Sequence, residues 1–313
     1  MRVVSPGTRA LVVDMGRPGL RHMGVPLSGA ADRHSFQIAN WLVGNAPGAG
    51  ALECTLGGLR VEMARAAVVA VCGAETGLRI DGRDAPLWTA HRVGAGGTVS
   101  LGAVRHGVRS YLAVSGGVEG ERHFGSLSTY PLAGLGANGG RALVPGDALE
   151  VGEASGASRE LPASLRPRLS NHVTLRARSL GEWERLSPES KRRLFVAPWR
   201  AGGATSRMGA RLDSVSDGGK LELSDDRPLV SSPLLPGTLQ VPPDGRPILS
   251  LVDGHCTGGY ARAIQVIASD MWVAGQVGPG TTVSFHRAFE ADPPAILAAR
   301  MATWGSVIEG YAV

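Results

Sequence analysis

The chain has 313 residues, with 32 Lys and Arg against 27 Asp and Glu, so its formal net charge is +5. A hydrophobic content of 43% is enough for a real core and excludes a disordered chain. No stretch approaches the ~20 consecutive apolar residues of a membrane helix, and the N-terminus lacks the apolar core of a signal peptide. Because the basic residues are dispersed, we expect no nucleic acid as a partner. The lack of a signal peptide and of a membrane helix predicts a cytoplasmic protein without a membrane partner.

The cysteines and lysines exclude several kinds of site. Cys54, Cys72 and Cys256 are an odd number without CxxC spacing, which argues against a disulfide framework and a thiolate metal site. No His and acidic residues have metal-ligand spacing, so no metal is expected. Lys191 and Lys220 are the two lysines; neither lies between methionines as a biotin-accepting lysine does, and Lys220 lacks the residues of a P-loop. A biotin or Walker-type ATP site would therefore belong to another chain.

Short apolar runs bounded by Gly, Pro or Asp dominate the chain and predict strands. They cover residues 10–13, 66–72, 98–101, 111–114, 149–151, 173–175, 248–252, 264–267 and 282–285. Three helices are expected. Asp32 is the N-cap of the first, Ser187 begins the second, and the third follows Asp292. The sequence therefore predicts a mainly β protein with a few short helices.

The stretch 152–167 separates two halves of domain size. It is poor in β-branched residues and rich in Ala, Ser, Gly and Pro. We expect a first β-barrel-like half over 1–155, a connection over 156–172, and a second β half with a C-terminal helix over 173–313. Similar turn-and-strand patterns at 144–151 and 277–285 suggest that the two halves are related barrels.

The densest group of polar residues lies between Asp14 and Asn45, among Gly and Pro turns that lead into the first predicted helix. A loop with many donors and acceptors before a helix N-terminus suits recognition of a small polar or anionic group. The candidates in this segment are Arg17, His22, Ser28, Asp32 and Asn40. For Asp32 a plain capping role is the favoured alternative. For Arg17 and His22 the structural and binding interpretations are equally open.

A second segment, residues 236–260, carries polar groups on two turns joined by an apolar strand. Gln240 and Asp244 flank a Pro-Pro-Asp-Gly turn. The bend that follows the strand consists of Thr257, Gly258, Gly259 and Tyr260. Backbone N–H groups of such a bend can face a carboxylate or carbonyl oxygen. Each turn by itself is ordinary, but because a strand connects them we expect the two turns to share one cleft.

A series of motifs runs through both segments. Between Asp14 and Thr55 the sequence contains DxGRxG, GVPxSGAxDxxS, ANxLVGN and LExT. Further along are RSYLAVSGG at 109–117, GSLST at 125–129, GRALVPGD at 140–147, SRMGAR at 206–211, PGTLQVPPDGRP at 236–247 and TGGY at 257–260. On these motifs nearly the whole chain resembles the biotin-dependent carboxyltransferase family, which contains allophanate hydrolase subunit 2, the C-type component of bacterial 5-oxoprolinase, and the C-terminal part of the carboxyltransferase domain of urea carboxylase.

Two positions depart from the family pattern. Leu127 stands where the family has Arg in GSRST, which removes a cation that could pair with an anionic ligand. Cys256 stands where the family has Thr, which favours packing over catalysis for this thiol.

The resemblance implies tandem cyclophilin-like β-barrels in a protein that works with a smaller subunit 1 or B-type partner and with a LamB/YcsF-type protein. The complex would use ATP, bound on this chain or on a partner, to convert 5-oxoproline to L-glutamate. One alternative is carboxyl transfer to a urea-like amide from carboxybiotin, with biotin supplied in trans. Another is a non-catalytic regulator that binds a kinase-inhibitor-type partner.

The residues themselves predict a polar, glycine-lined cleft between the two β units for a small carboxylate-bearing ligand. We assign Arg17 and Arg207 to anion binding, and Gln240 with the bend at 257–260 to orienting the amide carbonyl. His22 or Asp244 would handle the protons.

Overall fold

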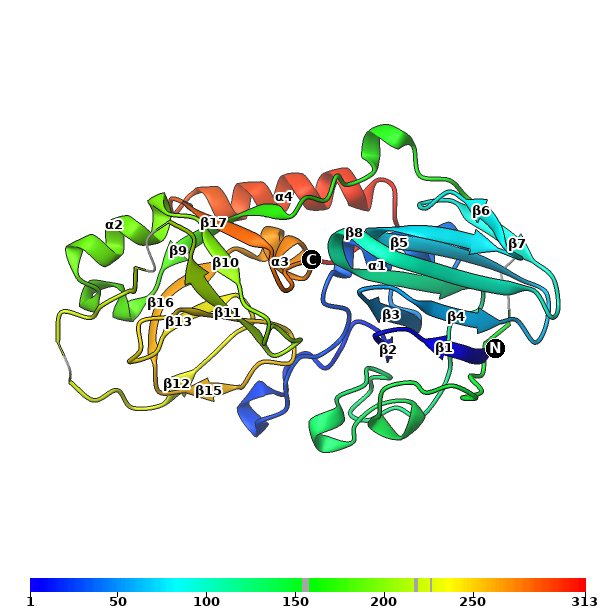
Figure 1. The fold of residues 1–313 in the computed structure, drawn as a ribbon, viewed down its shortest axis with the longest axis horizontal. Coiled ribbons are helices and arrows are strands. Elements are labelled where there is room, and N and C mark those ends of the chain that lie inside the picture. Colours follow the sequence, from blue (N-terminus) through cyan, green and yellow to red (C-terminus); the bar gives the residue numbers. More distant parts are fainter. Residues whose placement is uncertain (154–157, 217–218, 226) are drawn as a thin grey trace. The chain divides into compact units, whose positions relative to one another are not determined.

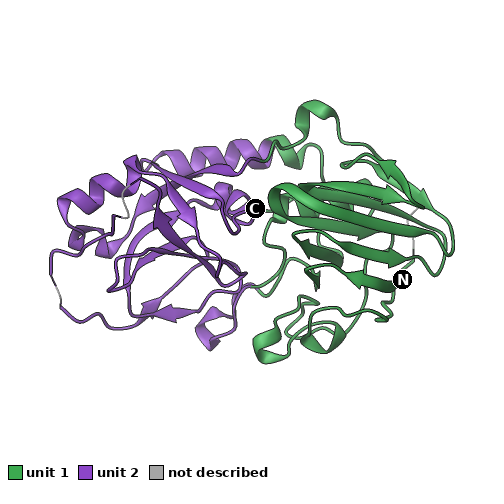
Figure 2. Cartoon of the chain, in the orientation of Figure 1, with its two compact units in different colours: residues 1–17, 28–169, 303–312 green, residues 18–27, 170–302, 313 purple. Residues whose placement is uncertain are grey.

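The computed structural model describes residues 1–153, 158–216, 219–225 and 227–313. They form two compact units, coloured separately in Figure 2. The first unit consists of residues 1–17, 28–169 and 303–312, and the second of residues 18–27, 170–302 and 313. The N-terminal segment 18–27 thus belongs to the second unit, and the C-terminal segment 303–312 belongs to the first. The predicted connection over 156–172 begins in residues outside the described part of the chain.

An antiparallel sheet of eight strands builds the first unit (Figure 1). The strands are β1 (Arg2–Pro6), β2 (Arg9–Val13), β3 (Ala51–Thr55), β4 (Leu59–Glu62), β5 (Ala67–Ile80), β6 (Arg83–Ala85), β7 (Ala90–Val93) and β8 (Thr98–Val114). β5 and β8 pair along most of their length, from Val69 opposite Val114 to Ile80 opposite Val99. β8 joins the two runs 98–101 and 111–114 that the sequence pattern separates. Val and Leu side chains of these strands, together with the neighbouring Met1 and Met63, form one buried core.

Helix α1 (Arg33–Leu42) packs against β5 and β8 of this sheet. As predicted, Asp32 is its N-cap: the carboxylate accepts hydrogen bonds from the Ser35 backbone N at 2.9 Å and from Ser35 Oγ at 2.6 Å. The buried side chains of Phe36, Ala39 and Leu42 give the helix its apolar face.

Seven strands of the second unit close into a barrel in the order β10-β11-β14-β13-β16-β9-β17. They are β9 (His172–Ser179), β10 (Trp199–Ala201), β11 (Gly209–Ser214), β13 (Thr238–Val241), β14 (Ile248–Ser250), β16 (Ala261–Val266) and β17 (Thr282–Arg287). β9 and β17 run parallel, whereas the other pairs in the barrel are antiparallel. A separate ribbon pairs β12 (Ser232–Pro233) with β15 (Thr257–Gly258). Leu175, Trp199, Leu239 and Phe285 are among the side chains of the barrel core.

The other two predicted helices are present as α2 (Pro188–Val196), capped by the Ser187 side chain, and α4 (Asp292–Gly305). α3 (Met271–Ala274) was not predicted, because a single turn is too short to show a helical period. Short 3-10 turns are η1 (Arg21–Met23), η2 (Pro131–Ala133), η3 (Asn138–Gly140), η4 (Ala163–Leu165), η5 (Gly181–Arg185) and η6 (Ala268–Asp270). Among the described residues, no helix is both long and apolar enough to cross a membrane.

The prediction of a strand at 149–151 is wrong. Leu149 N donates to Met1 O at 2.7 Å and Glu150 O accepts from Glu119 N at 3.0 Å, so the run divides its hydrogen bonds between two segments and extends no ladder. The broader prediction, a mainly β fold with two barrel-like sheets and a few helices, is confirmed.

Candidate functional site

The carboxylate of Asp14 organises the polar loop cluster of the first unit, which we define as residues 14–17 and 126–128. Asp14 follows β2 and is buried. Its carboxylate accepts hydrogen bonds from Ser126 Oγ and Ser128 Oγ, both at 2.6 Å, and from the backbone N of Leu127 at 2.7 Å and of Gly16 at 2.8 Å. These contacts join two loops that are more than a hundred residues apart in sequence.

Arg17 completes this cluster from the other side. Its side chain is 1% exposed, and the guanidinium donates to the carbonyl oxygens of His123 at 3.0 Å and Ser128 at 2.6 Å. A guanidinium held by backbone carbonyls fixes the loop it spans, and this geometry favours the structural interpretation. Anion binding by Arg17 stays a prediction.

Leu127 belongs to the buried core of the first unit. A Cβ placed on Gly50 would lie 2.8 Å from Leu127 Cδ1, so the side chain packs closely against the backbone there. The position at which the family pattern has Arg therefore holds an apolar side chain turned into the core in this protein.

The remaining candidates of the first unit are buried as well. Asp32 caps α1, and its backbone N donates to the Tyr111 hydroxyl at 2.7 Å. The Asn40 amide donates to Ala49 O at 2.9 Å. Ser28 has a left-handed backbone with φ of 52°, and its hydroxyl has no hydrogen-bond partner among the described residues. Ligand binding by these three side chains stays a prediction.

In the second unit, Arg207 forms a buried ion pair with Asp253. Arg207 Nε lies 2.7 Å from Asp253 Oδ2 and Nη2 lies 3.1 Å from Oδ1, and both side chains are less than 5% exposed. Asp253 N also donates to Arg207 O at 3.0 Å. This two-point contact uses the guanidinium to join the loops before β11 and after β14, so the role of Arg207 in anion binding likewise stays a prediction.

Gln240 on β13 lies against the predicted bend at 257–260. A Cβ on Gly258 would lie 2.7 Å from Gln240 Oε1, so Gly258 is needed for this close approach. Gln240 Nε2 reaches Ser250 Oγ at 3.5 Å. The structure thus brings together Gln240 and the bend, the two elements predicted to orient an amide carbonyl.

His22 lies on the exposed turn η1, where Nδ1 is 2.9 Å from Gly19 O. Its neighbour Arg21 fixes this turn within the second unit, because the guanidinium donates to the carbonyl oxygens of Leu234 and His255, each at 2.7 Å. Burial lowers the pKa of Arg21 below its ordinary value. Proton transfer by His22 stays a prediction.

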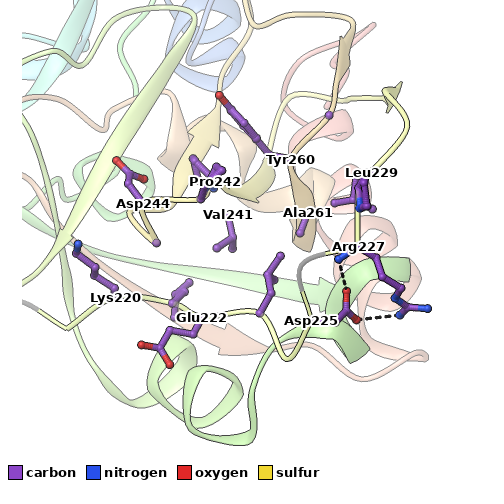
Figure 3. Close-up of a pocket in the computed structure, with 16 residues that line it drawn as sticks. Lys220, Glu222, Asp225, Arg227, Leu229, Val241, Pro242, Asp244, Tyr260 and Ala261 are labelled. Atoms are coloured by element: carbon purple, nitrogen blue, oxygen red, sulfur yellow. Dashed lines mark hydrogen bonds and ion pairs between the residues drawn. The ribbon is translucent and has the colours of Figure 1, made fainter.

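A pocket of about 530 Å³ opens in the second unit where β13 ends and β16 begins (Figure 3). Both predicted turns line it, so the structure brings together Asp244, Gly259 and Tyr260. Gln240, Thr257 and Gly258 are not among the described residues that line this pocket. Apolar side chains in the lining are Leu221, Leu223, Pro228, Leu229, Val241, Pro242, Pro243 and Ala261, and charged ones are Lys220, Glu222, Asp225, Arg227 and Asp244.

The segment 220–223 forms one wall of this pocket. Leu221 N donates to Gly245 O at 2.9 Å, and Glu222 N donates to Ser190 Oγ of α2 at 2.7 Å. Gly245 has φ of 73°, and a Cβ there would lie 2.7 Å from Lys220 Cβ. Glycine is therefore required for this wall to pack against the 242–245 turn.

The acids of the pocket are mostly neutralised by arginines. Asp244 Oδ2 lies 2.7 Å from Arg211 Nη1. The pKa of Asp244 is below its ordinary value because the carboxylate accepts a hydrogen bond from the Arg246 backbone N and lies beside Arg211. Asp244 is therefore ionised at neutral pH.

Asp225, on another side of the pocket, is bound by two arginines. Arg227 Nη2 lies 2.8 Å from Asp225 Oδ2, drawn as a dashed line in Figure 3, and Arg185 binds Oδ1. Hydrogen bonds from Arg227 and Arg185 hold the pKa of Asp225 well below its usual range.

Lys220 and Glu222 were not predicted as site residues. Neither side chain has an ion pair or hydrogen bond among the described residues. The signal in the sequence is the alternation of Lys220 and Glu222 with two leucines after a Gly-Gly pair, which places apolar and charged side chains on opposite faces. No group of three His, Cys, Asp or Glu side chains suited to a metal occurs in the described part of the chain.

Comparisons with known proteins identify the class to which this fold belongs. Residues 23–287 match the family model "Carboxyltransferase domain, subdomain A and B". The chain is 37% identical to the C-type subunit of 5-oxoprolinase from Escherichia coli (strain K12) over 287 residues, which are 91% of this chain and 90% of that protein. It is 30% identical to urea amidolyase of Saccharomyces cerevisiae (strain ATCC 204508 / S288c) over 304 residues, 91% of this chain and 16% of that protein.

Among solved structures, the Kluyveromyces lactis urea carboxylase matches with a TM-score of 0.90 and 26% identity. That match covers 99% of this chain and 29% of the urea carboxylase chain. The chain belongs to the carboxyltransferase domain family, subdomains A and B, as the motifs predicted.

Proposed function

We propose that this chain is a subunit of a heteromeric, ATP-dependent amidohydrolase that converts 5-oxoproline to L-glutamate. The observation that carries the proposal is the 37% identity to the C-type subunit of a 5-oxoprolinase over about nine-tenths of both proteins. The urea amidolyase relative is matched over the same share of this chain, but over 16% of its own length.

The pocket of the second unit supports this proposal by its chemistry. 5-Oxoproline is a five-membered lactam with one carboxylate, so it needs an apolar surface for its ring and a cation for its charge. Leu223 and Pro243, which are at least partly exposed, supply the surface, and Lys220 in the same lining supplies the cation. Ring opening adds one water across the lactam C–N bond, and we assign Asp244, a carboxylate of the lining, to accept a proton from that water.

ATP does not fit this pocket. The described lining has two cations, Lys220 and Arg227, and three carboxylates, Glu222, Asp225 and Asp244. A nucleoside triphosphate brings several negative charges, and Lys220, the one cation of the described lining without a described partner, cannot balance them alone. We therefore place ATP on a partner chain, of the B type or of the LamB/YcsF type, where it would activate the amide carbonyl.

The test is glutamate formation by this chain purified together with the subunits encoded by its neighbouring genes. We expect glutamate only when ATP, 5-oxoproline and all subunits are present. Asp244→Asn should lower the rate about a hundredfold, as expected for loss of a proton acceptor. Asp213→Asn is the matched control, because Asp213 is also an exposed, arginine-paired carboxylate of this unit but lies outside the described lining.

A second candidate function is carboxyl transfer from carboxybiotin to a urea-like amide, favoured by the match to urea carboxylase. Biotin would be carried by another chain. A stably assembled complex that forms no glutamate but carboxylates urea from carboxybiotin would replace the first proposal by the second. A complex that binds its partners without either reaction would indicate the regulatory alternative.

A further inference from the structure

The two lysines of the chain have different surroundings, although both lie in the second unit. Lys191 Nζ is 2.5 Å from Glu184 Oε2 and 5.8 Å from the centre of the Trp183 ring. Lys220 lines the pocket, and its ammonium has neither an ion pair nor a hydrogen bond among the described residues. Lys220 is thus a cation at a concave surface whose charge no described side chain neutralises.

The backbone holds Lys220 at a fixed place beside the 242–245 turn. The next residue, Leu221, donates to Gly245 O, and the missing side chain of Gly245 leaves the space in which Lys220 Cβ packs. The ammonium lies on the side of the pocket where Asp244 lies, whereas the Glu222 carboxylate is directed away from that side (Figure 3).

The charges on this side of the pocket favour an anion. Arg211 pairs with Asp244 at 2.7 Å, and Arg246 pairs with Asp213 at 2.6 Å. With both carboxylates paired, Lys220 is the charged lining residue on this side without a described partner, because the Glu222 carboxylate is directed away (Figure 3). A positive charge at the rim of an apolar concavity attracts ligands that have a single anionic group.

We infer that Lys220 binds the carboxylate of a small ligand whose apolar body lies on Leu223 and Pro243, apolar residues of the same lining that are at least partly exposed. The pocket is then a site for small ring-shaped carboxylates, and Lys220 distinguishes them from neutral lactams and amides. Naming 5-oxoproline as the ligand rests on the proposed function. This assignment gives the anion-binding task to Lys220, while the guanidinium groups of Arg17 and Arg207 hold loops of their own chain.

Two pairs of ligands test this inference by titration of the full chain, followed by calorimetry and by amide NMR shifts of pocket residues. The first pair is 5-oxoproline and 2-pyrrolidinone, the same lactam without its carboxylate. The second pair is cyclopentanecarboxylate and cyclopentanecarboxamide. Lys220→Met should lower the affinity for both carboxylates about tenfold, the size expected for one charge-assisted hydrogen bond. The affinity for both neutral ligands should stay within about twofold of the wild type.

The controls separate binding from folding. Lys220→Arg should retain affinity within about threefold because it keeps the charge, and Lys191→Met should leave all four ligands unchanged. Raising the salt concentration should lower the affinity of the wild-type chain for the two carboxylates and should not change the affinity of Lys220→Met for them. Equal weakening of charged and neutral ligands by Lys220→Met would overturn the inference, as would unchanged or undetectable binding of the carboxylates.

The outcomes also distinguish this inference from the proposed function. If cyclopentanecarboxylate binds through Lys220 and the complete complex forms no glutamate from 5-oxoproline and ATP, the pocket assignment holds and the 5-oxoprolinase proposal fails. If the complete complex forms glutamate and Lys220→Met leaves its KM for 5-oxoproline unchanged, the proposed function holds and the assignment of Lys220 fails.

Discussion

The polar loop cluster of the first unit and the pocket of the second unit use charged side chains in opposite ways. In the cluster, Asp14 and Arg17 are buried, and their hydrogen bonds go to hydroxyl and backbone groups of the same unit. In the pocket, Lys220 and Glu222 belong to the lining and have no described partner, and Asp244 is paired with Arg211.

This difference shows why a dense group of polar residues in a sequence is not by itself a binding site. A buried charge must be paired or hydrogen-bonded to be tolerated, so much of the polar content of the Asp14 to Asn45 segment is required by the fold. A charge at a rim costs little to keep unpaired, because water solvates it until a ligand arrives. A charged side chain that is exposed at a concave surface is therefore a better sign of a binding site than a high density of polar residues along the sequence.

Removal of the Asp14 carboxylate should have the largest effect on stability. Asp14→Ala leaves buried donors of Ser126, Leu127 and Ser128 without their acceptor, and we expect a loss of about 4 kcal/mol in the free energy of unfolding. Asp14→Asn, which keeps one acceptor oxygen, should lose about half as much. Urea unfolding measures both. A loss below about 1 kcal/mol for Asp14→Ala would mean that water replaces the carboxylate and that the cluster is open to ligands.

Breaking the Arg207 ion pair should come next. Arg207→Met leaves the buried Asp253 carboxylate uncompensated, so we expect a loss of about 3 kcal/mol in the free energy of unfolding. The double variant Arg207→Met/Asp253→Leu should recover most of this loss, because it removes both buried charges.

Ligand binding by the Arg207 variants separates a structural role from anion binding. If Arg207 has only a structural role, the folded double variant Arg207→Met/Asp253→Leu should bind the test carboxylates with the affinity of the wild type. A lost affinity in the stable double variant would return Arg207 to the anion-binding role that the sequence predicted.

Much of the fold could be predicted from sequence because its signals are local. The N-caps Asp32 and Ser187 and the helix after Asp292 are set by residues within a few positions of the helix start, and all three helices are present. Strand runs were found by their apolar content, but the length of β8 was not, because residues between its two apolar runs are half polar and pair with β5 only in the folded sheet. The exchange of 18–27 and 303–312 between the units depends on long-range contacts that no local pattern records.

The site could be predicted only in part, for the same reason. The two turns that carry Asp244 and Tyr260 were recognised, since turn residues have a strong local signature. Lys220 was missed because its wall is joined to the 242–245 turn by Leu221 N and Gly245 O, groups that are 24 residues apart in sequence. Whether an arginine faces a ligand or a carbonyl of its own chain, as for Arg17, also depends on tertiary structure.

Asp147 should give the first unit a pH-dependent stability. Its carboxylate accepts hydrogen bonds from Arg141 at 2.7 and 2.8 Å, Val144 N at 2.9 Å and Asn138 Nδ2 at 3.0 Å. The hydrogen bond from Arg141 is the main cause that lowers the pKa of Asp147 to about 2. Because this pKa is below the unfolded value, the stabilisation is complete above about pH 4 to 5 and is lost as the pH falls towards 2.

The expected result is a difference in melting temperature between wild type and Asp147→Asn that is largest at neutral pH and shrinks below pH 4. Asp84→Asn is the matched control, since the Asp84 ion pair with Arg79 is exposed and should add little at any pH. A constant difference between wild type and Asp147→Asn across the pH range would mean that the carboxylate is not the group that stabilises this loop.

The smallest expected effect has the opposite sign and concerns the tight turn at residues 123–126. His123 and Ser126 exchange backbone hydrogen bonds at 2.9 and 3.2 Å, and Phe124 between them has φ of 52° with a side chain that is 56% exposed. A left-handed conformation costs a non-glycine residue about 1 kcal/mol, and such turns prefer Asn-Gly. Phe124→Asn should therefore raise the free energy of unfolding by about 1 kcal/mol, whereas Gly125→Ala, at φ of 78°, should lower it by a similar amount.

A stabilised Phe124→Asn variant would mean that the first unit holds an exposed aromatic side chain which its fold does not need. Phe124 would then resemble Lys220 of the second unit, because contacts within the fold explain neither side chain. An unchanged or lower stability would show that contacts of the Phe124 ring offset the strain of its backbone. The polar loop cluster, which Arg17 ties to this turn through His123 O, would then extend to the surface of the unit as one structural element.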